Sequence, residues 1–397
     1  MKYCIIIPDG MADYPIEKLG GRTPLETART PYLDLLSENG RIGTVQTIPR
    51  GFPPGSDVAN LTIVGYNPSD YYTGRAPLEA ASIGIQLEEE DCAFRCNFIT
   101  ANEDTLVDFC AGHIKTEEAD ILIKLLNERF GNDAIQFYTG KSYRHIMVYK
   151  GTQKINTTCF PPHDIMGKSI EEHLPKGKGS EIIIDIMERS RGLLYNHDIN
   201  KVRIDLQENP ANMIWLWGHG YRPKMPSFQE RFNLKGAVIT AVDLIKGISL
   251  YLGWDIINVP GATGYYDTDY SNKGKYAIEA LENHDMVLVH IESPDEAGHE
   301  GNIKEKVTAI EQIDSKIIGP ITDAGNSFQE LRILVLPDHY TPIEKRTHTA
   351  EPVPFVVCGS GIQKDDGKPL TEANAAASKL HISKGHELIE RLISGSF

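Results

Sequence analysis

Residues 285–299 read DMVLVHIESPDEAGH, an apolar run followed by polar residues. Residues 286–291 are apolar apart from one histidine, and the run stops at the polar turn that begins with Glu292. An apolar run without alternation predicts a strand covered on both faces, as in the interior of a parallel sheet. Asp295 and His299 follow directly, and both side chains can bind a metal ion. The stretch therefore predicts a buried strand with metal-binding groups at its carboxyl end.

The same strand pattern occurs elsewhere in the chain. Further apolar runs that end at a turn comprise residues 3–8, 213–217, 237–241, 331–336 and 354–358. Helical patterns lie between them, at residues 30–39, 242–252, 273–283, 303–324 and 384–394. Strands that alternate with helices predict an α/β domain on a mainly parallel sheet, in which functional residues gather at the carboxyl ends of the strands.

The middle of the chain has a different character. It contains charge-rich helical patterns at residues 117–130 and 181–191 and shorter strands at residues 134–138 and 145–149. A stretch rich in glycine and lysine lies at residues 176–180. Glycine and lysine pack poorly, so the last of these predicts an exposed loop. We predict a discontinuous core domain formed by residues 1–87 and 210–397, with residues 88–209 inserted as a smaller α+β cap domain.

Composition narrows the class of protein. The chain has 397 residues, with 55 acidic and 40 basic side chains and a formal net charge of −15. Such an acidic chain is a poor partner for nucleic acid or for an anionic membrane surface. Six cysteines form no disulfide framework, and no apolar run approaches the roughly 20 residues that span a bilayer. We expect a cytoplasmic enzyme with a small-molecule substrate; the sequence does not specify its oligomeric state.

Side chains that can bind a metal ion follow three of the predicted strands. The set consists of Asp9, Asp295, His299, Asp338, His339 and His348. Carboxylates and imidazoles together suit zinc, manganese and related divalent ions. Six ligands exceed one tetrahedral site, whereas two ions about 3.5–4 Å apart would use them all in a phosphoryl transfer. Any one of these residues is equally a turn or cap residue, so the prediction depends on their joint occurrence.

Ser56 lies in the segment FPPGSDVAN, residues 52–60. The glycine before it and the helical pattern after it predict that its hydroxyl lies at a helix N-terminus, where phosphate binds well. The pattern by itself favours a serine that only caps the helix. A hydroxyl held against divalent cations would instead be ionised and nucleophilic, which is the chemistry of transfer through a phosphoserine. The local sequence leaves both interpretations open.

Several segments resemble those of the archaeal-type cofactor-independent phosphoglycerate mutases, members of the alkaline phosphatase superfamily. They are PDGMAD at 8–13, PGSDVAN at 54–60, GRAPLE at 74–79, DEAGH at 295–299, DHYTP at 338–342, and His348 followed by EPVP at 351–354. The resemblance runs in this order through nearly the whole chain. It implies an alkaline-phosphatase-like core that binds metal ions, with an inserted domain that closes over the substrate.

The resemblance also implies roles for individual residues. One metal ion would be held by Asp9, Ser56, Asp338 and His339, and a second by Asp295, His299 and His348. Ser56 would be the nucleophile that becomes phosphorylated. The implied activity interconverts 3-phosphoglycerate and 2-phosphoglycerate without 2,3-bisphosphoglycerate, in glycolysis and gluconeogenesis. Ligands of these types accept manganese, zinc, cobalt or magnesium, so the metal itself stays open.

A phosphorylated hydroxy-acid is strongly anionic, so an acidic protein needs local cations to bind it. Arginine binds carboxylate and phosphate in a bidentate manner. The candidates are Arg75, Arg95, Arg144, Arg191 and Arg203, together with Lys235, which resembles a substrate lysine of the wider mutase group. Most surface arginines are merely solvated, and the sequence does not divide these between phosphate and carboxylate.

Other functions on the same core remain open from the sequence. A homoserine kinase-like phosphotransferase would use a nucleotide, yet the chain lacks a complete P-loop and a complete GxGxxG motif. A phosphatase or phosphonate hydrolase would share the metal ligands and differ in the inserted domain. A binding protein stabilised by metal ions would have no need of a nucleophile at Ser56.

Overall fold

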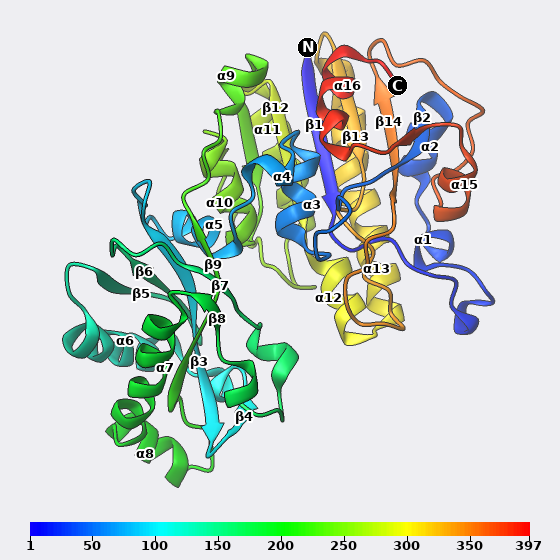
Figure 1. The fold of residues 1–397 in the computed structure, drawn as a ribbon. Coiled ribbons are helices and arrows are strands. Elements are labelled where there is room, and N and C mark those ends of the chain that lie inside the picture. The colour runs from blue at the N-terminus through cyan, green and yellow to red at the C-terminus, as the bar shows by residue number, and fades with distance from the viewer. The chain divides into compact units, whose positions relative to one another are not determined.

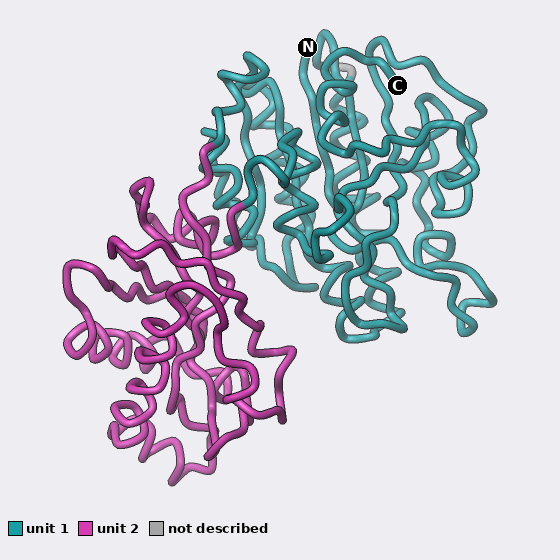
Figure 2. The backbone as a smooth tube through the Cα atoms, viewed as in Figure 1, with its two compact units in different colours: residues 1–72, 225–397 teal, residues 73–224 magenta. Residues whose placement is uncertain are grey.

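The computed structural model describes residues 1–325 and 327–397. The chain forms two compact units (Figure 2). Unit 1 comprises Met1–Tyr72 and Met225–Phe397, and unit 2 comprises Thr73–Lys224. Unit 1 is thus assembled from two separate segments, with unit 2 inserted between them. Within the described parts of the chain, no helix is both long enough and apolar enough to cross a membrane.

Unit 1 is built on an eight-stranded sheet in the order β11-β10-β12-β1-β13-β14-β2-β15 (Figure 1). Its strands are β1 (Lys2–Pro8), β2 (Arg41–Val45), β10 (Gly236–Ile239), β11 (Asp255–Ile256), β12 (Met286–Ile291), β13 (Leu331–Val335), β14 (Val353–Gly359) and β15 (His381–Ile382). The five strands from β11 to β13 run parallel, whereas β14 is antiparallel to both neighbours. The predicted α/β class with a mainly parallel sheet is confirmed.

Helices cover both faces of this sheet, which explains why every residue of β12 is buried. They are α1 (Pro24–Thr27), α2 (Pro31–Asn39), α3 (Ser56–Ile63), α4 (Pro68–Tyr71), α9 (Phe228–Phe232), α10 (Asp243–Tyr251), α11 (Tyr270–Asn283), α12 (Ser293–Glu300), α13 (Ile303–Ile313), α14 (Gly319–Ala324), α15 (Glu372–Ala377) and α16 (Leu388–Ser394). Apolar side chains of α2, α11, α13 and α14 share one core with the sheet. Figure 1 shows α3 and α16 in front of the strands. A π-helical turn, Asp314–Ile318, joins α13 to α14 within the helix predicted for 303–324.

Unit 2 contains an antiparallel sheet in which β3 is central. Its strands are β3 (Cys92–Asn102), β4 (Thr105–Asp108), β5 (Ile135–Lys141), β6 (Arg144–Tyr149) and β9 (Met213–Tyr221), and β7 (Asn156–Thr158) pairs separately with β8 (Lys176–Lys178). Its helices are α5 (Arg75–Ser82), α6 (Thr116–Phe130), α7 (Ser180–Tyr195) and α8 (Asp198–Asp205). The core under α6 and α7 includes Leu122, Ile183 and Met187, whereas α5 contributes to a separate cluster. The 176–180 stretch is exposed as predicted, but it pairs as β8 instead of forming only a loop.

One strand was assigned to the wrong sheet from the sequence. Residues 213–217 were predicted to join the parallel sheet of unit 1, but β9 is antiparallel to β3 in unit 2. The reason is that β9 is buried on both faces, so it shows the same unbroken apolar run as an interior parallel strand. Because β9 and α5 both pack on β3, the two units divide at Tyr72/Thr73 and at Lys224/Met225.

Candidate active site

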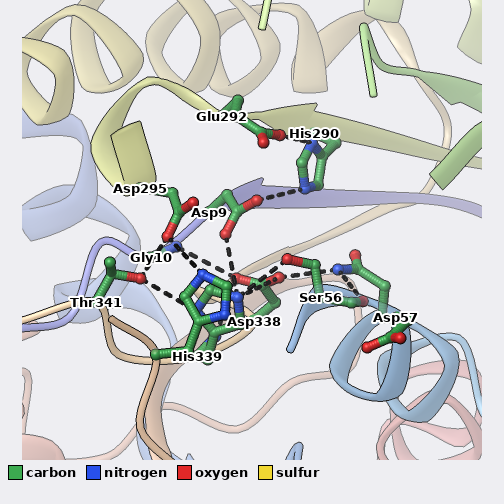
Figure 3. A network of polar contacts seen from close by, with 12 residues as sticks. Asp9, Gly10, Ser56, Asp57, His290, Glu292, Asp295, Asp338, His339 and Thr341 are labelled. Carbon is green, nitrogen blue, oxygen red and sulfur yellow. Dashed lines mark hydrogen bonds and ion pairs between the residues drawn. The ribbon is translucent and has the colours of Figure 1, made fainter. Parts of the chain in front are cut away.

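Three neighbouring strands bring the predicted metal ligands to one edge of the sheet. In β12, β1 and β13, Pro8 lies beside Ile291 and Ile6 beside Val335. Because these parallel strands are nearly in register, their carboxyl ends coincide. Asp9 follows β1 and Asp338 lies after β13, while α12 begins after β12 and carries Asp295. Figure 3 shows these carboxylates and Ser56 directed toward one another.

The first group of ligands consists of Asp295, His299 and His348. The Asp295 carboxylate lies 3.2 Å from His299 Nε2 and 3.4 Å from His348 Nε2. The two Nε2 atoms are themselves only 2.9 Å apart. Asp295 and His299 share one face of α12 because they are four residues apart. Three ligand atoms that converge within 4.8 Å of one another suit a divalent cation.

The second group consists of Asp9, Asp338 and His339, whose ligand atoms also lie within 4.8 Å of one another. His339 Nε2 lies 3.6 Å from Asp9 Oδ1 and 3.4 Å from Asp338 Oδ2. All three side chains are fully buried. Among the described residues, neither carboxylate oxygen of Asp9 has a hydrogen-bond partner. A buried carboxylate without partners is costly, and a bound cation would offset that cost.

Ser56 is the first residue of α3, and its side chain does not cap the helix. Gly55 is the N-cap residue, and there is no side-chain capping bond. The Ser56 hydroxyl instead lies 3.0 Å from His339 Nε2. Of the two interpretations that the sequence left open, the geometry therefore supports a hydroxyl directed at the ligand cluster.

The electrostatics of the cluster also favour a cation. Burial and the neighbouring carboxylates of Asp338 and Asp295 raise the pKa of Asp9 well above its usual range. Burial also opposes ionisation of Asp295, but hydrogen bonds with His299 and His348 outweigh it and hold the Asp295 pKa well below its usual range. Although burial alone would lower it, contact with Asp295 raises the pKa of His299 to about 9. A positive charge is thus favourable beside Asp9 and Asp295, whereas burial lowers the pKa of His339 and disfavours a charge on that ring.

Further groups, most of them on residues that the sequence did not single out, hold these ligands in place. Gly10 N–H and His339 N–H donate to Asp338 Oδ1 at 3.2 and 2.9 Å. Asn60 Nδ2 donates to Asp338 Oδ2 at 2.9 Å, and the Thr341 hydroxyl donates to Asp295. The spacing of four residues between Ser56 and Asn60 was the only local signal, since it places both on one face of a helix.

No residue larger than glycine fits at position 10, because the side chains of Thr341 and Asp295 occupy the space. A Cβ atom there would lie 2.4 Å from Thr341 Oγ1 and 2.6 Å from Asp295 Oδ1. Its φ of +61° is also a conformation that other residues rarely adopt. The close approach of Asp295 to the end of β1 therefore depends on glycine at this position.

A buried ion pair stabilises the chain segments that carry these ligands. Lys306 on α13 and Asp13 lie 2.7 Å apart, with side chains 0% and 1% exposed. Lys306 Nζ also donates to the carbonyl of Thr341 at 2.8 Å. Asp13 accepts a bond from Ile343 N–H at 3.1 Å. The pair therefore ties α13 and the segment after β1 to the segment that carries Thr341.

Unit 2 contains a cluster of arginines around one carboxylate. Glu79 Oε1 lies 2.8 Å from Arg75 Nε, and Glu79 Oε2 lies 2.8 Å from Arg95 Nε. Burial opposes ionisation of Glu79, but Arg95 and Arg75 outweigh it and lower its pKa. Burial, together with the nearby charges of Arg75 and Arg144, lowers the pKa of Arg95 to about 10 although the Glu79 carboxylate opposes this shift. Three guanidinium groups for one carboxylate leave an excess of positive charge that suits an anionic ligand.

The other predicted substrate residues lie elsewhere. Arg203 is 3% exposed and pairs with Glu118 and Glu208, so its guanidinium serves the fold of unit 2. Arg191 lies on α7, and the described residues give it no hydrogen bond or ion pair. Lys235 precedes β10, at the sheet edge opposite the ligands, and pairs with Asp255 at 3.3 Å. Of the predicted candidates, the structure brings Arg75, Arg95 and Arg144 together.

Comparison with known proteins identifies relatives along the whole chain. A family model described as 2,3-bisphosphoglycerate-independent phosphoglycerate mutase matches residues 37–200. A protein of that name from Methanosarcina mazei is 50% identical over 395 residues, which cover 99% of this chain and 100% of the relative. A protein from Geobacter sulfurreducens, named as a probable enzyme of the same kind, is 48% identical over 398 residues, covering 99% and 100%.

Solved structures agree with these relatives. A protein from Pyrococcus horikoshii superposes with a TM-score of 0.83 at 32% identity, covering 99% of this chain and 96% of the other. A cofactor-independent phosphoglycerate mutase from Thermoplasma acidophilum superposes with a TM-score of 0.68 at 27% identity, covering 99% of each chain. The resemblance recognised in the sequence motifs is confirmed. On the strength of full-length relatives with half of their residues identical, the chain belongs to the 2,3-bisphosphoglycerate-independent phosphoglycerate mutase family of enzymes.

Proposed function

We propose that this enzyme interconverts 3-phosphoglycerate and 2-phosphoglycerate through a phosphoserine at Ser56, with two divalent cations and without 2,3-bisphosphoglycerate. The observation that carries the proposal is the position of Ser56. Its hydroxyl takes no part in capping α3 and lies 3.0 Å from His339 Nε2, within a cluster of carboxylates and imidazoles. A nucleophile beside such a cluster is the arrangement that phosphoryl transfer requires.

The residues present fit two cation sites. Asp295, His299 and His348 would hold one cation, and Asp9, Asp338, His339 and Ser56 the other. Bound divalent cations supply positive charge that lowers the pKa of a coordinated hydroxyl and neutralises phosphoryl oxygens. Thr341 and Asn60 keep the Asp295 and Asp338 carboxylates oriented through their hydrogen bonds.

The transfer itself takes place in two displacements at phosphorus. Ser56 Oγ loses its proton and attacks the phosphoryl group of 3-phosphoglycerate, and the bond to the 3-oxygen breaks as the Oγ–P bond forms. The 3-oxygen takes up a proton, and glycerate stays bound while it reorients. The 2-hydroxyl oxygen then loses its proton and attacks the phosphoserine. The Oγ–P bond breaks and Ser56 Oγ takes up a proton, which regenerates the serine. Every atom of the substrate is retained, so no second phosphorylated compound is needed.

Arg75, Arg95 and Arg144 are proposed to bind anionic groups of this substrate. Their charges exceed the single carboxylate of Glu79 among them, so the cluster can accept a carboxylate or a phosphate.

We expect Arg144→Met to raise KM for phosphoglycerate about 10- to 100-fold, the cost of one or two charged hydrogen bonds. Arg144 is exposed, so the substitution should leave the fold intact. Steady-state kinetics measure the effect, and Arg189→Met provides a matched exposed arginine of unit 2. An unchanged KM in Arg144→Met would remove this residue from the proposed anion site.

Removal of a single ligand should weaken metal binding directly. We expect His299→Ala to lower the affinity for Mn²⁺ by at least about 100-fold, since even indirect support of a metal ligand contributes 10- to 100-fold. Isothermal titration of the metal-free protein with Mn²⁺ measures this, with His386→Ala as the control for loss of a histidine outside the cluster. Equal affinities in the two variants would contradict the assignment.

Phosphorus NMR tests the whole proposal. The purified protein is supplied with Mn²⁺ and 3-phosphoglycerate, but with neither nucleotide nor bisphosphoglycerate. The expected result is the resonance of 2-phosphoglycerate. Release of inorganic phosphate alone would identify a phosphatase, and an unchanged spectrum that responds only to ATP and homoserine would identify a kinase-like phosphotransferase.

A further inference from the structure

Tyr72 is the last residue of unit 1 before the chain enters unit 2 at Thr73. It follows α4 directly, and its backbone N–H donates to the Pro68 carbonyl oxygen at 2.9 Å. Its side chain, in contrast, contacts the segment that carries Ser56. The junction between the two units is therefore attached to the segment that presents the proposed nucleophile.

The Tyr72 side chain contacts this segment both before and after Ser56. Its ring packs on Phe52, with the ring centroids 6.3 Å apart and the planes inclined at 74°. Both aromatic side chains pack against a buried apolar cluster that includes Val58. The Tyr72 hydroxyl donates a hydrogen bond to Asp57 Oδ2. One side chain thus holds the segment on either side of the serine.

Asp57 carries the contact from Tyr72 to the backbone at Ser56. Its side chain is buried, and its Oδ1 accepts a bond from Val58 N–H at 2.9 Å. The same oxygen lies over Gly55, where a Cβ atom would come within 2.8 Å of it. A carboxylate in the first turn of a helix is also favoured by the helix dipole. The Asp57 carboxylate is therefore fixed against the backbone that leads into Ser56.

The Ser56 hydroxyl depends on this backbone for its direction. Asn60 Nδ2 donates to the Ser56 carbonyl oxygen at 2.9 Å, which holds the carbonyl but not the hydroxyl. A serine side chain has three staggered rotamers, and the observed one places Oγ 3.0 Å from His339 Nε2. Figure 3 shows the Ser56 hydroxyl directed toward the ligand cluster and the Asp57 carboxylate directed away from it. The two neighbouring side chains thus have separate tasks.

We propose that Tyr72 is a positioning residue for the nucleophile: through Asp57, it holds Ser56 Oγ in the orientation toward His339. Tyr72 takes no part in making or breaking bonds. Because Tyr72 is also the residue at which the chain leaves unit 1, a displacement at this junction changes the position of Asp57 and the direction of the hydroxyl. Its effect on catalysis rests on the proposed role of Ser56 as the nucleophile.

Tyr72→Phe tests this role, because it removes the hydroxyl and keeps the ring contact with Phe52. We expect kcat for phosphoglycerate interconversion to fall about 10- to 100-fold, since misplacement of a reacting atom by about 1 Å can cost about 100-fold. KM should change by less than about twofold, because the proposed substrate binding by the arginines of unit 2 is not altered. Tyr71→Phe is the matched control: it removes a hydroxyl from the preceding residue, whose ring contacts Tyr66, and should retain the wild-type kcat and KM.

A double-mutant cycle shows whether Tyr72 acts through Asp57. In the Asp57→Ala background, Tyr72→Phe should cause no further loss of kcat, because the hydrogen bond that it removes is already absent. The inference is overturned if the losses in the two single variants multiply in the double variant. It is also overturned if the kcat of Tyr72→Phe equals that of Tyr71→Phe.

Crystal structures of the same variants give a readout that is independent of activity. Ser56 should populate a second rotamer in Tyr72→Phe, whereas in Tyr71→Phe its Oγ should stay within hydrogen-bond distance of His339 Nε2. An unchanged Ser56 in Tyr72→Phe would contradict the positioning role. A wild-type protein that does not interconvert phosphoglycerates would contradict the proposed function instead, and the comparison of Ser56 rotamers would still decide the role of Tyr72.

Discussion

Replacement of Ser56 by alanine should lower kcat for phosphoglycerate interconversion by at least about 10⁴-fold, which is typical for loss of a covalent nucleophile. The reason is that, in the proposed mechanism, Ser56 Oγ forms the bond that carries the phosphoryl group between the two oxygens of the substrate. The remaining ligands keep their mutual hydrogen bonds, so Ser56→Ala should still bind divalent cations. Steady-state kinetics with either phosphoglycerate isomer, together with Mn²⁺ titration, measure both quantities.

Ser69→Ala is the matched control for this experiment. Ser69 is an exposed serine in α4, a helix of the same unit, and lies outside the ligand cluster. A radiolabelled phosphoryl group should be retained on the wild-type protein and on Ser69→Ala after acid quenching, but not on Ser56→Ala. If Ser56→Ala retained more than about one tenth of the activity, transfer through a phosphoserine at this residue would be excluded.

The second large effect concerns stability. We expect Lys306→Met to destabilise unit 1 by about 3–5 kcal/mol, the usual cost of leaving one member of a buried ion pair without its partner. The Asp13 carboxylate would keep its bond from Ile343 N–H but lose the ammonium group at 2.7 Å. The Thr341 carbonyl would lose its donor as well. Urea unfolding should show an earlier transition, with little effect on the unfolding of unit 2.

Lys304→Met separates this effect from the general loss of a lysine on α13. Lys304 is exposed and two residues away, so its replacement should change stability by less than about 0.5 kcal/mol. Hydrogen exchange monitored by mass spectrometry distinguishes the two units, because peptides from β1 and β13 report on unit 1 alone. Equal protection of these peptides in the two variants would show that the Lys306–Asp13 pair does not stabilise unit 1.

The sequence predicted the parallel part of the sheet well because a strand that is buried on both faces has an unbroken run of apolar residues. β1, β12 and β13 are nearly uninterrupted apolar runs, and each is followed by residues that can bind a metal ion. Once these strands are parallel and adjacent, their carboxyl ends must coincide, so Asp9, Asp295 and Asp338 had to meet. Local pattern and global topology agree in this part of the chain.

The parts that could not be predicted depend on contacts between distant residues. The apolar run of β9 was assigned to the wrong sheet, because the run records burial and not the identity or direction of the neighbouring strand. The sequence around Arg203 did not distinguish it from a substrate-binding arginine, but its guanidinium forms an ion pair with Glu118. The pairing of Lys306 with Asp13 likewise joins residues that lie far apart in the chain. No window of sequence contains both members of such pairs.

The division of unit 1 into two chain segments has a consequence for biosynthesis. β1 pairs with β12 and β13, and β2 pairs with β14 and β15, so both strands of the first segment find their partners only in the second. At roughly 5–20 residues per second, Ser56 leaves the ribosome on the order of tens of seconds before His348. During that interval the nascent chain carries unpaired apolar strands while unit 2 emerges complete. Newly made protein is therefore most exposed to aggregation before the proposed catalytic residues can meet.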